Sequence, residues 1–436
     1  MKNLFLLLVI FCAIRFEVHS QTFALTGELI NSRYEHQSQL LSNGKVLAFG
    51  GLYSDGINNL FFNESELYNP GTGTWSASGD MQVPRAYFAS VILDNGKVLA
   101  IGGANGQDYD GMRSCELYDP ASGQWTYTDS TITQRSFHDA VKLNDGRVLI
   151  AGGAYADEEA EIYDPASSTW SATGNLNNVY GTYLSLVLLS NGNVLATGGS
   201  EAEIYDPPTG QWTAVPGGTV HPESNHSSVL LNNGNVLLVS EYCEIYDAGT
   251  NSFSTTDAPE ISRQYNPAIK LDNGNVLVFG WGEFFSFTDT KAIEVYNVST
   301  GQWFVPQAYD EYAVNRYTIH KLQNGKILAV AGVNPAIACD SSYLITESGG
   351  SAIESIKFAI EVSVYPNPAS EQVIIESLSE NISSIIIHDL LGKEILRMEE
   401  MNDQKISVSL DGISSGVYLV KIVTDEGEVV KKIVVE

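Results

Sequence analysis

Two series of side chains that could bind a polar ligand recur before seven apolar segments in the first three quarters of the chain. The first series stands eight residues before the last leucine of each segment and comprises Arg33, Arg85, Arg135, Gly181, Glu223, Arg263 and Val314, with Arg316 close by. The second series follows three residues later and comprises His36, Phe88, His138, Leu184, His226, Asn266 and Tyr317. Guanidinium forks bind carboxylates and hydroxyls, so the charged and imidazole members of both series are candidate ligand-binding residues at a channel mouth. The alternative is that the arginines bind backbone carbonyls within the scaffold.

Aromatic side chains in long loops form a second candidate site. The loops at 52–65, 104–115, 282–293 and 333–340 are long, whereas those at 200–202 and 242–243 are minimal. If the segments close into a ring, the long loops are neighbours, and they and the residue before one of them supply Tyr53, Phe61, Phe62, Tyr109, Trp281, Phe284, Phe285 and Phe287. These rings suit stacking on sugars or contact with a protein loop. The alternative is that they pack against one another to hold the loops in place.

The elements that must position these residues are copies of one pattern. An Asx-Gly dipeptide, typical of a tight hairpin, recurs at Asn43-Gly44, Asn95-Gly96, Asp145-Gly146, Asn191-Gly192, Asn233-Gly234, Asn273-Gly274 and Asn324-Gly325. A Glu-x-Tyr strand follows the first six, and we expect Ser341 and Tyr343 to take these two places in the seventh. An aromatic residue opens a fourth strand in six copies, at Trp75, Trp125, Trp170, Trp212, Phe253 and Trp303. Residues 22–29 align with residues 74–81, so the N-terminal strand is expected to complete the last copy.

The repeats resemble the kelch, or galactose oxidase, type of β-propeller. Paired glycines (Gly50-Gly51, Gly102-Gly103, Gly152-Gly153, Gly198-Gly199), Tyr-Asp-Pro turns (118–120, 163–165, 205–207) and the spaced tryptophans carry the resemblance. It implies an all-β, seven-bladed propeller over residues 21–347, with the N-terminal strand completing the last blade. The pairs Ser240-Glu241, Gly280-Trp281 and Ala331-Gly332 depart from the glycine pattern.

The resemblance leaves two function classes open, a non-catalytic module that binds a glycan or a protein, and an enzyme. The copper-radical oxidases of this fold need a Tyr-Cys crosslink and an adjacent Tyr-His pair, and the chain has no such pair. A sialic acid mutarotase would need Arg, Glu and His on a sugar acid, which Arg33, Arg85, Arg135, Glu223 and His226 would supply. We expect binding without catalysis, with no catalytic residue, metal or cofactor, because fold alone does not imply an activity.

Composition and the N-terminus predict an exported, monomeric protein. Residues 1–20 combine Lys2 with a short apolar run and end at Ser20, as a secretory signal does, and no other segment is expected to span a membrane. The formal charge of −29 argues against nucleic acid as a partner. The remaining cysteines, Cys115, Cys243 and Cys339, are expected to be small buried residues. The loop acids Asp108, Asp110, Asp157, Glu158 and Glu159 lack EF-hand spacing and are expected to be solvated.

The pattern changes after a linker at 348–360. Alternating strands over 361–436 predict a small immunoglobulin-like β-sandwich. This tail resembles the C-terminal sorting domain of the type IX secretion system of Bacteroidota. The resemblance is carried mainly by Tyr365 and the residues Pro366, Asn367, Pro368, Gly392, Lys393, Gly416 and Tyr418. It implies the secretion machinery as partner and a secreted or outer-membrane surface location.

Overall fold

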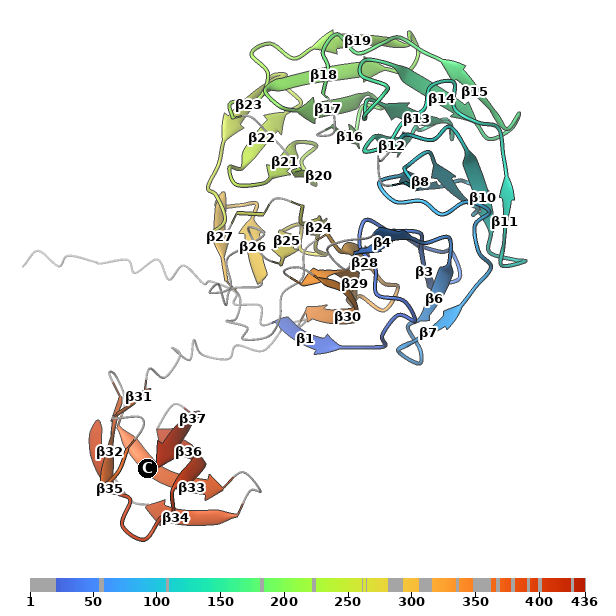
Figure 1. Cartoon of the computed structure of the whole chain (residues 1–436). Helices are drawn as coiled ribbons and strands as arrows, with labels where there is room; N and C mark the ends of the chain where they lie inside the picture. Colours follow the sequence, from blue (N-terminus) through green and yellow to red (C-terminus); the bar gives the residue numbers. More distant parts are fainter. Residues whose placement is uncertain are drawn as a thin grey trace, which may run out of the picture. The chain divides into compact units, whose positions relative to one another are not determined.

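The computed structural model describes residues 21–347 apart from 55–58, 107–109, 181–183, 222–224, 261, 264, 281–292, 306–315 and 335–336, and residues 362–435 apart from 366–368, 378–380, 390–392, 399–401 and 425–426. The chain forms two compact units, residues 1–349 and residues 350–436 (Figure 1). Every regular element in the described ranges is a β-strand, so these ranges contain no helix able to cross a membrane. The predicted signal segment and linker lie outside the described residues.

The described part of the first unit contains seven four-stranded sheets, arranged as the blades of a propeller (Figure 1). In six of them the strands run in chain order from the centre outwards. These are sheet one, β2 (Gln37–Leu40), β3 (Val46–Phe49), β6 (Ser65–Asn69) and β7 (Thr74–Ala77); sheet two, β8 (Ala89–Ile92), β9 (Val98–Ile101), β10 (Cys115–Asp119) and β11 (Gln124–Tyr127); and sheet three, β12 (Asp139–Lys142), β13 (Val148–Ala151), β14 (Ala160–Asp164) and β15 (Thr169–Ala172). A short hairpin, β4 (Leu52–Ser54) and β5 (Asn59–Phe61), follows β3.

The next three sheets repeat this order. They are sheet four, β16 (Ser185–Leu188), β17 (Val194–Gly198), β18 (Glu201–Asp206) and β19 (Gln211–Ala214); sheet five, β20 (Ser227–Leu230), β21 (Val236–Val239), β22 (Glu244–Asp247) and β23 (Ser252–Thr255); and sheet six, β24 (Ala268–Lys270), β25 (Val276–Phe279), β26 (Ile293–Asn297) and β27 (Gln302–Phe304). The closing sheet combines β28 (Thr318–Lys321), β29 (Ile327–Asn334), β30 (Ile337–Glu347) and β1 (Gln21–Leu25). The innermost strands contact one another in sequence around the axis, and β28 contacts β2, so the ring is closed.

The Asx-Gly dipeptides form the tight turns between the first and second strands, as predicted. Their glycines all have left-handed backbones, with φ between 79° and 91° at Gly44, Gly96, Gly146, Gly192, Gly234, Gly274 and Gly325. Only glycine adopts this conformation without steric cost. The side-chain oxygen of the Asx residue accepts the backbone N–H two residues on, for example from Lys45 to Asn43 at 3.0 Å.

The N-terminal strand completes the last sheet, as predicted. Phe23 pairs with Ile345 just as Trp75 pairs with Tyr68 in sheet one. The expectation for Tyr343 was wrong, because Tyr343 pairs with Ala329 where Glu66 pairs with Ala48, and Ile345 therefore takes the tyrosine position. A slip of two residues leaves every side chain on the same face of a strand, so alternation alone does not detect it.

The core of the first unit lies between adjacent sheets. The second strands of sheets one to five are buried along their length, which explains their unbroken apolar sequences. Aromatic residues join neighbouring sheets: the rings of Phe49 in sheet one and Trp125 in sheet two lie 5.0 Å apart. The predicted burial of Cys115 and Cys243 is confirmed, and the side chain of Cys339 lies outside the described residues.

The second unit is a sandwich of two sheets around its own apolar core. One sheet contains β31 (Val362–Tyr365), β32 (Gln372–Ser377) and β35 (Lys405–Ser409). The other contains β34 (Glu394–Met398), β33 (Ile382–Asp389), β36 (Gly416–Thr424) and β37 (Gly427–Val435). Tyr418 is buried in this core and donates from its hydroxyl to the Ser414 carbonyl at 2.8 Å. Pro366, Asn367, Pro368 and Gly392 lie outside the described residues.

Candidate functional site

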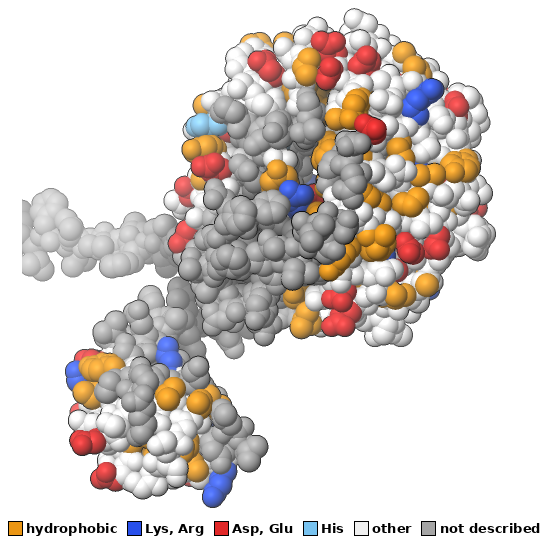
Figure 2. Space-filling model, viewed as in Figure 1, with side chains coloured by type: hydrophobic (Ala, Val, Ile, Leu, Met, Phe, Trp, Pro, Cys, Tyr) orange, Lys and Arg blue, Asp and Glu red, His pale blue; other side chains and the backbone are white. Residues whose placement is uncertain are grey.

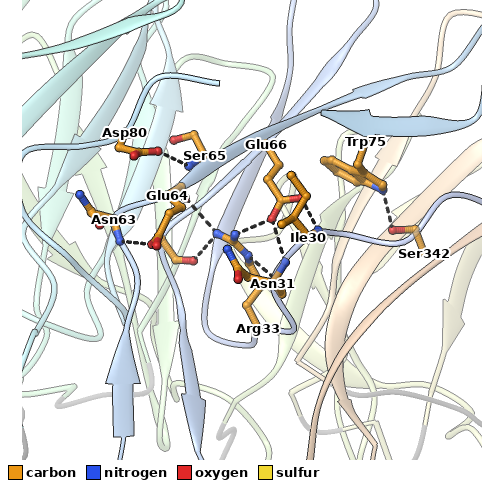
Figure 3. Close-up of polar contacts among 11 residues, drawn as sticks. Ile30, Asn31, Arg33, Asn63, Glu64, Ser65, Glu66, Trp75, Asp80 and Ser342 are labelled. Carbon is orange, nitrogen blue, oxygen red and sulfur yellow. Dashed lines mark hydrogen bonds and ion pairs between the residues drawn. The ribbon is translucent and has the colours of Figure 1, made fainter. Parts of the chain in front are cut away.

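The arginines of the first series are buried scaffold residues. Arg33 donates from Nη2 to Glu66 Oε1 at 2.7 Å and from Nη1 to the carbonyls of Gly50 and Glu64 at 2.9 and 3.0 Å (Figure 3). The equivalent ion pairs are Arg85–Glu116 at 2.7 Å, Arg135–Glu161 at 2.5 Å and Arg263–Glu294 at 2.6 Å. All four arginine side chains are 0% exposed. This corrects the expectation that they line an open mouth.

The glutamate of each pair ties the chain that enters the innermost strand to the sheet. Glu66 accepts the backbone N–H groups of Ile30 and Asn31 at 2.6 and 3.3 Å (Figure 3). Burial lowers the pKa of the Arg33 guanidinium, and the charge of Glu66 opposes that effect. A buried ion pair with all these hydrogen bonds satisfied is a structural device, because breaking it would strand a charge.

Sheets four and five keep the glutamate but replace the arginine. Glu203 accepts from the backbone and side-chain nitrogens of Asn177 and Asn178 and from the Tyr180 hydroxyl. Glu244 accepts from the backbone N–H of His221 at 2.6 Å and lies 3.0 Å from its Nδ1. Glu223, predicted in the arginine position of sheet five, lies outside the described residues.

The second series lies between the sheets rather than in the mouth. A Cβ built on Gly50 would meet the Phe88 ring at 2.7 Å, and one on Gly102 would meet His138 Cε1 at 3.1 Å. The glycine pairs are therefore needed because a Cβ has no room: the first glycine lies against the next sheet, as Gly50 does against Phe88, and the second lies against its own repeat, as Gly51 does against His36. Burial lowers the pKa of His36 to about 3 and of His226 to about 4, and holds that of His138 well below its usual value. These imidazoles are neutral packing residues at physiological pH.

In each repeat, the residue directly before the second-series position lies where the chain enters the innermost strand. This end of the strand is the one away from the Asx-Gly hairpin. The six described residues at this position have left-handed backbones with φ between 51° and 61°, and we call them the axial ring: Glu35, Tyr87, Phe137, Asn225, Tyr265 and Arg316. Backbone hydrogen bonds link neighbours around it, from Phe137 N to Tyr87 O at 2.8 Å and from Tyr265 N to Asn225 O at 2.9 Å. Arg316 N donates to Tyr265 O at 3.2 Å.

The axial ring presents aromatic faces and one ion pair. The rings of Tyr87 and Phe137 lie 4.2 Å apart at 30°, and the Arg316 guanidinium lies 4.4 Å from the centre of the Tyr265 ring. Arg316 also forms an ion pair with Glu35 across the junction of the closing sheet and sheet one. Burial raises the pKa of the Glu35 carboxyl, and the Arg316 charge opposes the shift. Tyr265 is 37% exposed and the other described members are partly exposed, so solvent reaches these side chains.

Sequence reasoning named Arg316 and missed the rest of the axial ring. Bulky residues rarely have positive φ, so nothing in the sequence marked Tyr87 or Phe137 as left-handed. Asn225 is the one member whose type favours this backbone. The useful signal was the position itself, always two residues after the scaffold arginine position.

The aromatic loop site is placed only in part. Phe62 is buried, and the Arg33 guanidinium lies 5.3 Å from its ring centre, so Phe62 packs on the scaffold. Tyr53 and Phe61 lie on the β4–β5 hairpin and are partly exposed. Tyr109, Trp281, Phe284, Phe285 and Phe287 lie outside the described residues.

Acidic, histidine and cysteine side chains do not cluster in the part of the chain that the structure describes. Among the residues that the structure describes, no three His, Cys, Asp or Glu side chains gather closely enough to hold a metal ion. Burial raises the pKa of the Cys115 thiol to about 11, so this sulfur is protonated at neutral pH and is a poor ligand.

On the face drawn in Figure 2, acidic side chains are spread around the rim of the propeller, in keeping with the acidic composition.

Comparisons with known proteins find a family match within each unit. Residues 84–129 match the kelch motif, and residues 363–436 match the secretion system C-terminal sorting domain. A solved structure of a fungal alcohol oxidase of the AA5 family, in complex with copper, superposes with a TM-score of 0.63. It is 15% identical over 96% of this chain and 100% of its own, which shows a shared fold. No curated protein matches the chain.

The sorting domain directs the protein to the cell surface or the extracellular space and implies contact with the secretion machinery. The first unit is therefore a β-propeller that contains a kelch motif, and the second is a C-terminal sorting domain of the type IX secretion system.

Proposed function

We propose that the exported propeller is a non-catalytic binding module whose ligand sits on the axial ring. The observation that carries the proposal is the absence of glycine among its six described members, although every one has a left-handed backbone. All seven hairpin positions, whose φ is also positive, do use glycine. A left-handed backbone costs a residue with a side chain roughly 1–2 kcal/mol, so side chains are kept here at a cost.

A glycan is the ligand that the axial ring fits best. Sugars offer flat C–H faces for stacking on Tyr87, Phe137 and Tyr265, and hydroxyls that can donate to Glu35 or accept from Arg316. Because Glu35 already neutralises Arg316, the six described members carry no net charge to attract an acidic ligand. This favours a neutral saccharide over a sugar acid.

The mutarotase alternative loses its support. Arg33, Arg85 and Arg135 are buried and occupied by glutamates, and His226 is buried between sheets and neutral. The carboxylate of a sugar acid would therefore need a cationic partner other than these arginines and His226.

A glycan array probed with residues 21–436 tests the proposal. Tyr87→Gly and Phe137→Gly remove the aromatic faces while relieving backbone strain, so both variants should fold and lose binding by about tenfold or more. Tyr127→Ala is the matched control, because Tyr127 is 59% exposed on β11 and lies outside the axial ring.

The outcomes separate the alternatives. Wild-type binding that both glycine variants lose, and that Tyr127→Ala keeps, supports a glycan site on the axial ring. Binding kept by both glycine variants would place the ligand elsewhere. Failure of the wild-type protein to bind any glycan would contradict the carbohydrate assignment and favour a protein ligand.

A further inference from the structure

The sheet β34–β33–β36–β37 of the sorting domain has an apolar outer face. Along β36 the side chains alternate: Tyr418, Val420 and Ile422 belong to the core, whereas Val417 and Leu419 point outwards and are 37% and 38% exposed. We call the outward apolar residues of this sheet that are at least partly exposed the apolar face: Val417, Leu419, Val423, Ile395 and Val434; Ile386 also faces outwards but is only 7% exposed.

Strand pairing places these residues together. Val434 pairs with Val417, and Ile386 pairs with Lys421, which lies between Leu419 and Val423 on the same side of β36. Ile395 is 38% exposed, while its neighbour Leu396 on β34 packs against the core. Paired residues of antiparallel strands share a face, so the apolar side chains form one patch.

The opposite sheet of the same domain supplies a comparison. The outward positions of β32 are Gln372, Ile374 and Glu376, and those of β35 are Lys405, Ser407 and Ser409. Five of these six are polar, as expected for a sheet face in contact with water. The apolar face departs from this rule, and an exposed apolar patch on a small domain marks an interaction site.

We propose that the apolar face is the surface by which the sorting domain docks on the secretion machinery. The whole face lies within the residues that match the sorting domain, whose role requires recognition by a component of that machinery. The polar residues beside the patch are Lys421 on β36, His388 on β33 and the ion pair of Arg397 with Glu394 on β34, a surplus of basic groups that suits a partner surface with an apolar centre and carboxylates at its edge.

Secretion of full-length variants from a bacterium that has this secretion system tests the proposal. Val417→Thr combined with Leu419→Thr makes the face polar while keeping side chains that suit a strand. The secreted fraction, measured by immunoblot of medium and cell fractions, should fall by about tenfold or more, with the protein retained inside the outer membrane. Ile374→Thr, on the outer face of the other sheet, should be secreted like the wild type.

Three results would overturn the proposal. These are normal secretion of the double variant, equal retention of the Ile374→Thr control, or a change in oligomeric state of the purified double variant, which would assign the face to a second copy of the chain. Equal thermal unfolding of the purified variants excludes misfolding as the cause. Deletion of 361–436 should block secretion. This deletion variant shows whether the domain is needed for secretion at all, separately from whether the apolar face is the docking surface.

Discussion

At the scale of the residue, one buried arginine holds three parts of the repeat together in sheets one, two, three and six. Arg85 donates to the carbonyls of Gly102 and Ser114 at 2.7 and 2.8 Å and to Glu116 at 2.7 Å. Glu116 in turn accepts the backbone N–H of Gln82 at 2.6 Å, in the segment that approaches the innermost strand. The candidate ligand arginines are therefore the residues whose loss should damage the fold rather than binding alone.

Arg85→Ala is expected to lower the free energy of unfolding by about 3–5 kcal/mol, because Glu116 would remain buried without its cation. Chemical denaturation measures this change. Replacing both partners, as Arg85→Met with Glu116→Leu, should recover part of the loss. Arg147→Ala is the control, since Arg147 and Asp145 form an ion pair that is 38% and 49% exposed and should be worth less than about 1 kcal/mol. A loss for Arg85→Ala no larger than for Arg147→Ala would contradict the scaffold role.

Asp139 should make stability depend on pH. Its carboxylate accepts the backbone N–H of Leu186 at 2.8 Å across the junction of sheets three and four, and burial raises its pKa to about 6. The folded pKa lies above the unfolded value of about 3.9, so its contribution to stability is fully present below pH 4 and is lost as pH rises through 6.

Asp139→Asn should therefore be more stable than the wild type at pH 8, by at most about 3 kcal/mol, with the advantage shrinking below pH 4. Urea unfolding of both proteins across this range measures the difference. The buried histidines destabilise both proteins equally in acid, so they cancel in the comparison. Asp94→Asn, on an exposed carboxylate, should show no comparable rise between pH 4 and 8. A pH-independent difference for Asp139→Asn would refute the assignment.

At the scale of the element, the period of two and the turn residues were enough to predict the strands. Asx-Gly turns and the buried second strands have strong local signatures, and the alignment of residues 22–29 found the partner of the last sheet. Side-chain direction at the end of the innermost strand was not predictable. Arg33 turns into its own sheet, His36 between sheets and Glu35 to the axis, because one left-handed residue redirects the chain.

Removal of β1 should open the ring. A chain that starts at Leu29 leaves β30 without its outer partner and loses the backbone bonds of five paired residues. At about 1 kcal/mol for each net hydrogen bond, the first unit should lose several kcal/mol and unfold at a clearly lower temperature. A peptide of residues 21–29 added to the truncated protein should restore part of the lost midpoint. An unchanged unfolding midpoint would show that β1 does not close the propeller.

At the scale of the whole molecule, the two units are specified in different ways. The first unit was predictable because its pattern is repeated, so each copy corrects errors in the others. Where one copy departs from the pattern, as at Tyr343, the predicted strand register was wrong by two residues. The sorting domain was identified by motifs, but those motifs name buried residues such as Tyr418, and the surface it presents followed only from strand pairing.

The pairing of β1 with β30 also sets the order of folding. β1 precedes every other strand of the first unit in the chain and pairs with β30, which follows them all, so the closing sheet depends on the most distant strand pairing in that unit. Contacts between such distant segments form slowly, because a long loop must close first. The propeller cannot reach its native state until β30 can pair with β1. A chain that is still bound to the ribosome or only partly translocated therefore keeps an unclosed ring.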